Sequence, residues 1–236
     1  MVSQSDSVSD LALHDLGDSL RNLTTIQDLT FTFLSCEKIT DKGLYFLSKN
    51  LKRFRLLKRL RMKVWGPDCL SIARFYIIGR VLKSLTSLQV LEIGFGEKWE
   101  QTFSVKKPLF SKKMEGAENV PKWLKNCRHN LQRLGLLFCG RENLTDVKLE
   151  IFSKGLEKLT SLQNICLIFC SCKYISNPRL LSLCEGLEKL VLLREINFDF
   201  YKCEAVTDAG IWKARERLLS RLPSLIKIAI SKANVE

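Results

Sequence analysis

Apolar residues recur along this chain at a fixed spacing, and one pattern of them returns in segments far apart. Segments 20–33, 82–95, 156–169 and 187–200 share the pattern L-x2-L-x2-[LI]-x2-[LI]-x-[LIF]-x-F. The intervals between equivalent positions are 31, 31, 43, 31, 31 and 32, which indicates a repeat of period 31 with one insertion of twelve. These equivalent positions are Ile26, Leu57, Leu88, Leu131, Leu162, Leu193 and Leu225.

Each unit combines two periodicities. In residues 29–33, every second residue is apolar, which is the period of a strand with one buried face. In residues 39–54, apolar residues stand at offsets 0, 5, 8, 12 and 15, which trace one face of a helix. Polar pairs suited to helix capping precede the helices at Thr40–Asp41, Thr145–Asp146, Ser176–Asn177 and Thr207–Asp208.

A unit of one strand and one helix cannot bury both apolar faces alone, whereas stacked units can. We therefore predict an α/β fold in which a parallel sheet lines the concave side and helices cover the convex side. We expect residues 1–236 to form a single domain of about seven repeats, interrupted by an inserted loop at 97–121. We also expect a partner to cover the ends of the array, or the chain to be a piece of a longer one.

A family resemblance supports this architecture. The segment CRHNLQRLGLLFC at 127–139 and the segments CEKITD at 36–41, CKYISN at 172–177 and CEAVTD at 203–208 resemble the motif of ribonuclease-inhibitor-like leucine-rich repeats, in the cysteine-containing subclass of F-box leucine-rich-repeat proteins. The resemblance implies a horseshoe-shaped solenoid that binds partners through its concave sheet face.

The outward positions of the strands define the predicted binding face. It is cationic on an early strand, apolar in the middle and acidic on the sixth strand, a mixture that favours a protein partner. We predict a scaffold or adaptor role, with the following contact residues on the concave face: Arg59, Arg61, Lys63, Val90, Glu92, Arg133, Leu137, Cys166, Ile168, Glu195 and Asp199.

The charge of the chain leaves a second partner class open. The net charge is +13 with a pI near 9.4, and segment 51–65 carries seven Lys or Arg and no acid. A basic protein of this kind favours anionic partners, such as RNA or an acidic protein tail. Nucleic acid is the less favoured partner, because Asp28, Glu92, Glu195 and Asp199 interrupt the cationic track.

The inserted loop mixes cations with apolar groups. Its pattern is typical of a solvated excursion, but it also fits a contact with a partner or an anionic surface. The candidate contact residues of this loop are Trp99, Lys106, Lys107, Phe110, Lys112 and Lys113.

Catalysis and metal binding find little support in the sequence. Only two histidines are present, no motif of a known enzyme class occurs, and we expect no enzyme activity, cofactor or metal. Cysteines hold equivalent repeat positions, which favours ladders of buried thiols, with zinc or a redox pair as alternatives. We predict a cytoplasmic or nuclear protein, because the start of the chain lacks a signal-peptide pattern and no apolar run is long enough to span a membrane.

Phenylalanine also recurs at one repeat position. Its spacing from the buried strand residues is even, which predicts a spine inside the core and not an aromatic surface. The residues concerned are Phe33, Phe95, Phe138, Phe169 and Phe200.

Overall fold

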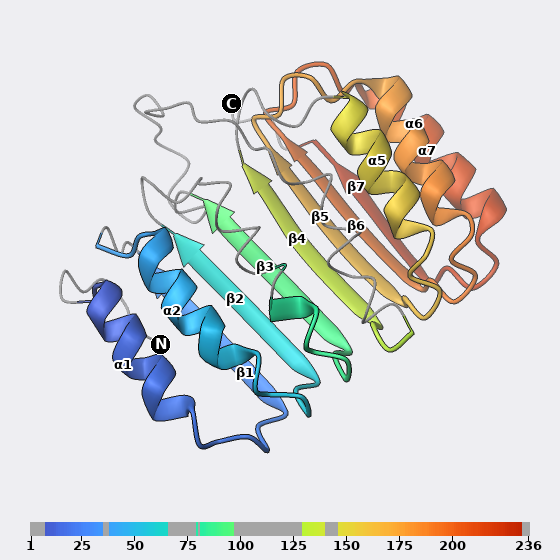
Figure 1. Cartoon of the computed structure of the whole chain (residues 1–236). Helices are drawn as coiled ribbons and strands as arrows, with labels where there is room; N and C mark the ends of the chain where they lie inside the picture. The colour runs from blue at the N-terminus through green and yellow to red at the C-terminus, as the bar shows by residue number, and fades with distance from the viewer. Residues whose placement is uncertain are drawn as a thin grey trace.

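The computed structural model describes residues 8–34, 38–65, 79, 81–96, 129–139 and 146–232. Seven strands lie side by side in one sheet, in the order in which they follow along the chain, and every neighbouring pair is parallel (Figure 1). The strands are β1 (Asp28–Leu34), β2 (Arg59–Trp65), β3 (Val90–Gly96), β4 (Arg133–Cys139), β5 (Asn164–Cys170), β6 (Glu195–Tyr201) and β7 (Lys227–Ser231).

Helices cover one face of this sheet. In Figure 1, α1 and α2 lie together over the first strands, and α5, α6 and α7 lie together over the last strands. The helices are α1 (Asp10–Leu20), α2 (Asp41–Leu51), α5 (Asp146–Leu156), α6 (Asn177–Leu187) and α7 (Asp208–Arg221).

The strand register follows the repeat period that the sequence predicts. Leu29 pairs with Leu60, one period further along the chain, and Leu60 pairs with Leu91. Leu91 then pairs with Leu134, so the insertion falls between β3 and β4. The predicted α/β leucine-rich-repeat solenoid is confirmed. The inserted loop at 97–121 lies outside the described residues.

The predicted phenylalanine spine is part of the core. The rings of Phe138 and Phe169 stack at a centroid distance of 5.3 Å, and those of Phe169 and Phe200 stack at 5.1 Å, each pair tilted by only 10°. Phe33 is also buried, while the side chain of Phe95 lies outside the described residues. Aromatic side chains in identical repeat positions stack because neighbouring strands lie only about 4.8 Å apart.

Two cysteines at the predicted ladder position beyond the strands, Cys172 and Cys203, are buried. The Cys172 thiol donates to the carbonyl oxygens of Cys170 and Phe138, and the Cys203 thiol donates to those of Tyr201 and Phe169. The hydrogen bond with Cys203 and burial raise the pKa of Cys172 well above its ordinary value, and the same hydrogen bond lowers the pKa of Cys203. These thiols thus satisfy backbone groups at the strand ends, as structural residues do.

Helix starts are joined from one repeat to the next. The Thr40 side chain accepts from the Lys42 backbone N–H, as predicted, and both its backbone N–H and its hydroxyl donate to the Asp10 carboxylate, at 2.8 and 2.6 Å. Thr207 likewise caps its own helix and bonds to Asn177 of the preceding one.

The caps predicted at Ser176 and Thr145 are not seen as side-chain hydrogen bonds in the described residues. At Ser176 the helix begins where the sequence predicts, but the serine side chain makes no capping bond. Pro178 stands in the first turn of that helix, and proline has no N–H for a cap to accept from. The capping residue predicted at Thr145 lies outside the described residues.

Candidate functional site

The sheet face turned away from the helices, which we call the concave face, is built from three rows of side chains. Each strand contributes three residues to it, because residues at even spacing share one face. The first row is Asp28, Arg59, Val90, Arg133, Asn164, Glu195 and Lys227; the second is Thr30, Arg61, Glu92, Gly135, Cys166, Asn197 and Ala229; the third is Thr32, Lys63, Gly94, Leu137, Ile168, Asp199 and Ser231.

The two arginines of β2 are paired with acids of the neighbouring strands. Arg59 Nε lies 2.5 Å from Asp28 Oδ2, and Arg61 Nε lies 3.0 Å from Glu92 Oε2. A second guanidinium nitrogen of Arg61 lies 3.8 Å from Asp28, so one network joins β1, β2 and β3. The basic stretch at 51–65 therefore presents less free charge on this face than its composition suggests.

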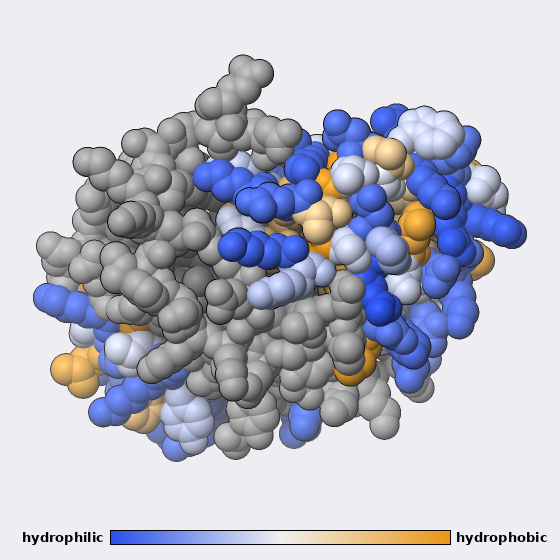
Figure 2. Space-filling view, turned by 90° about the horizontal axis from the view of Figure 1, so that it is seen from above, coloured by the Kyte–Doolittle hydropathy of each residue, from blue (hydrophilic) through white to orange (hydrophobic). Residues whose placement is uncertain are grey.

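A hollow of about 470 Å³ lies over the middle of the concave face. Its lining includes the apolar side chains of Leu137 and Ile168, the thiol of Cys166, and the backbone of Gly94 and Gly135. Figure 2, viewed from above, shows a described surface that is mostly hydrophilic with smaller hydrophobic patches. The residues that line the hollow combine apolar side chains with charged ones, which is the usual anatomy of a protein contact site.

Charged residues surround this hollow. Lys63 and Arg133 lie on its β2 and β4 sides, and Glu195 and Lys227 lie on its β6 and β7 sides. None of these four forms an ion pair with another residue in the described part of the chain. Their charges are therefore available to a partner, unlike those of the β2 arginines.

Cys166 is the thiol on the concave face, as its register predicts. Burial raises the pKa of Cys166, the nearby carboxylates of Glu92 and Asp199 raise it further, and the hydrogen bond from Asn197 lowers it. Because the thiolate is the reactive form of cysteine, this environment disfavours a nucleophilic role. Cys166 therefore contributes to the concave face as a small apolar side chain and not as a nucleophile.

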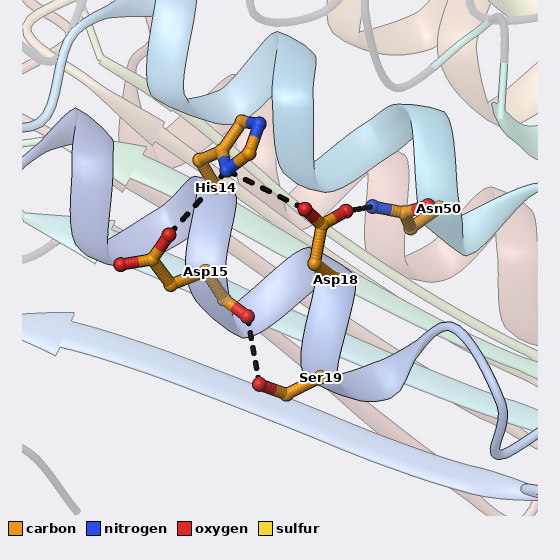
Figure 3. Close-up of polar contacts among 5 residues, drawn as sticks. All are labelled: His14, Asp15, Asp18, Ser19 and Asn50. Carbon is orange, nitrogen blue, oxygen red and sulfur yellow. Dashed lines mark hydrogen bonds and ion pairs between the residues drawn. The ribbon is translucent and has the colours of Figure 1, made fainter.

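Histidine and acids also gather on the outer helices at the start of the array, and Figure 3 shows their contacts. His14 Nδ1 lies 3.4 Å from Asp15 Oδ1 and 3.6 Å from Asp18 Oδ2, and Asn50 donates to Asp18. The Ser19 hydroxyl donates to the Asp15 backbone carbonyl and not to the imidazole. This arrangement stabilises the α1–α2 contact and is no Ser–His–Asp triad, because the serine and histidine are not hydrogen-bonded.

Metal binding and membrane insertion find no support in the described residues. Within those ranges, no group of three His, Cys, Asp or Glu side chains is placed to hold a metal ion. In the same part of the chain, no helix combines the length and the apolar composition that crossing a membrane requires.

The structure places all eleven predicted concave-face residues on that face. Leu137 is only 7% exposed, so it lines the hollow but offers little surface of its own to a partner. The sequence prediction did not single out Gly135, although a glycine in the interior of a strand was a signal that the backbone is open there. The predicted loop contacts lie outside the described residues: Trp99, Lys106, Lys107, Phe110, Lys112 and Lys113.

No protein-family model and no curated protein matches this chain. Among solved structures, it is similar to the tropomodulin C-terminal domain of Caenorhabditis elegans, at 10% identity and a TM-score of 0.43, covering 90% of this chain and 92% of that one. It is also similar to a Bacteroides fragilis protein (14%, TM-score 0.45, 98% and 64% covered) and to the leucine-rich-repeat protein LegL7 of Legionella pneumophila (13%, TM-score 0.40, 93% and 71% covered).

Proposed function

We propose that this chain is a protein-recognition module that binds a protein partner through its concave face, in a scaffold or adaptor role and without enzyme activity. The observation that carries the proposal is the hollow over β3–β6, where an apolar floor adjoins charged side chains that lack ion pairs within the described residues. Apolar centres with polar rims are typical of protein interfaces.

The alternative, an anionic partner such as RNA or an acidic protein tail, is less well supported. Asp28 and Glu92 already pair with Arg59 and Arg61, two of the seven cations of the basic stretch at 51–65. A nucleic-acid groove needs cations that follow the phosphates along much of its length. On the described concave face, Lys63, Arg133 and Lys227 would remain for that purpose.

The cysteine-containing, ribonuclease-inhibitor-like subclass remains part of this proposal, and so does a cytoplasmic or nuclear location. Cys172 and Cys203 support the subclass, since both hold the first position of its Cys-x2-[IV]-[TS]-[DN] element and both are buried. Reduced thiols in such positions suit a reducing compartment.

The deciding experiment is an affinity capture from cell extract in which the wild-type chain is compared with two variants. Ile168→Arg places a charge in the hollow and should abolish capture of the specific partner. Thr30→Arg places the same charge on β1 of the same face, outside the hollow, and should leave that capture intact. Equal capture by all three proteins would refute the proposal.

A parallel titration with heparin and with RNA separates the two partner classes. Protein recognition predicts weak binding, which the Arg59→Glu, Arg61→Glu, Lys63→Glu triple variant reduces no more than three charge reversals outside the concave face do. Tight binding that falls steeply with salt, and that the triple variant loses, would instead establish the anionic partner.

A further inference from the structure

Gly135 occupies the middle of β4, between Glu92 on β3 and Cys166 on β5. Its φ does not lie in the left-handed region, so the backbone there does not require glycine. A Cβ at this position would lie 3.2 Å from Glu92 Cγ, a contact that a small movement of a flexible side chain relieves. Glycine in a strand interior weakens the strand, and here its visible effect is to leave the concave face open.

Within the hollow of about 470 Å³, the row that contains Gly135 lacks one side chain. Glu92 and Cys166 stand two strand spacings apart, which is about 10 Å, and no side chain of their row stands between them. The backbone of β4 is exposed at Gly135, and Leu137 and Ile168 add apolar side chains to the lining toward the carboxyl ends of the strands. An aliphatic or aromatic group that entered here would leave water for an apolar surface.

The charges beside this opening differ between its two sides. Arg133 lies two residues before Gly135 on the same strand and face, about 7 Å away. Glu195 stands in the same row two strands further on, about 10 Å from Arg133. A partner therefore fits best with an acidic residue near Arg133, toward the amino end of β4, and a basic residue near Glu195 on β6, where Lys227 of β7 stands on the far side of the glutamate.

The sheet also restricts how a partner can bind. The backbone groups of β3, β4 and β5 are engaged in the ladder with their neighbours, so an additional strand cannot pair with them. Contact over Gly135 is made by side chains of the partner, as from a helix or a loop.

We infer that the hollow above Gly135 is an anchor pocket for one bulky apolar side chain of the protein partner, flanked by an acidic partner residue near Arg133 and a basic one near Glu195. This inference rests on the proposed function and names the chemistry of the segment that the concave face recognises. It places the specificity of the module in β4–β6 and not in the cationic strand β2.

A library of short random peptides displayed on phage provides the probe, with the full chain as bait. Selected peptides should carry a Leu, Ile, Phe or Trp with an acid on one side and a base on the other. Their affinity should fall at least about tenfold for Gly135→Leu, because the new leucine would fill the space that the apolar side chain of the peptide occupies. Thr30→Leu, a leucine in the same row on β1, is the control and should leave the affinity unchanged.

A charge exchange tests the flanking residues. Arg133→Glu should weaken the selected peptides about tenfold, and replacing their acid by lysine should restore binding to this variant. Selected peptides without a large apolar residue, or a lack of rescue by the lysine exchange, would overturn the inference.

The remaining outcomes separate the inference from the proposed function. If Ile168→Arg abolishes peptide binding and a folded Gly135→Leu does not, the anchor pocket is refuted while recognition by the concave face stands. If no selected peptide responds to Ile168→Arg, the proposed function itself fails. Should Gly135→Leu unfold, bound peptide must protect Cys166 from maleimide, as located by mass spectrometry, and unprotected Cys166 would refute the pocket.

Discussion

Replacing Phe169 by alanine removes the central ring of the spine that holds the last repeats together. Phe169 is 0% exposed and stacks on Phe138 on one side and on Phe200 on the other. Because the cavity would lie between two rings fixed on neighbouring strands, it could collapse little.

The expected loss in the free energy of unfolding is about 4 kcal/mol. Losses for Phe→Ala substitutions in cores run from about 3 to 5 kcal/mol, and each stacked pair contributes about 0.5 to 1.5 kcal/mol of the interaction that is removed. Phe169→Leu keeps most of the volume and should cost only about 1.5 kcal/mol. Tyr174→Ala, at an exposed position after the same strand, should change the stability by less than about 0.5 kcal/mol.

Urea unfolding followed by circular dichroism measures all three variants against the wild type. A loss below about 2 kcal/mol for Phe169→Ala, with an unchanged slope m, would refute the argument that the spine resists collapse. A lower m for Phe169→Ala would show that the repeats unfold in separate steps, as stacked repeats can when one interface is weakened.

Three further predictions follow from packing, capping and titration. Gly186→Ala should lower the unfolding free energy by about 1 to 3 kcal/mol, because the new Cβ would lie 2.6 Å from the Ser153 carbonyl oxygen. Elsewhere in a helix, replacing glycine by alanine usually stabilises the fold. A variant that is more stable in thermal unfolding would contradict this prediction. Asn177→Ala should cost about 1 to 2 kcal/mol in calorimetry, since it loses its bonds to Thr207 at 2.8 and 2.9 Å, and an unchanged melting temperature would disprove the contribution of this link. Burial raises the pKa of Cys184 to about 12, so the folded state keeps this proton at a pH where the unfolded state loses it. The free energy of unfolding should therefore fall between pH 9 and 12, by up to about 1.4 kcal/mol per pH unit. In urea unfolding, Cys184→Ala should remove this pH dependence, and an identical slope in the variant would refute the prediction.

The sequence predicted the repeat, the strands and the core well, because a side chain that recurs once in every repeat must meet its equivalent in the next one. The positions of Phe138, Phe169 and Phe200 followed from that rule alone. Periodicity determines which face a residue occupies, and the concave-face residues were placed correctly for the same reason.

The chemistry of the face was less predictable, since it depends on which side chains meet across strands. Arg59 and Arg61 looked like free cations in the chain, but Asp28 and Glu92 stand beside them in the sheet. Gly135 signalled an open backbone in the sequence, but only the structure shows that Glu92 and Cys166 stand on either side of it.

The hydrogen bonds that the Thr40 and Thr207 backbone N–H groups donate to Asp10 and Asn177 give the array a direction. In both of these described links, the residue that satisfies the start of a helix comes from about one repeat earlier in the chain. A newly formed helix can therefore complete its first turn as soon as the repeat before it has folded. Removing repeats from the amino-terminal side leaves the next helix start without this bond, whereas removing them from the carboxyl-terminal side does not.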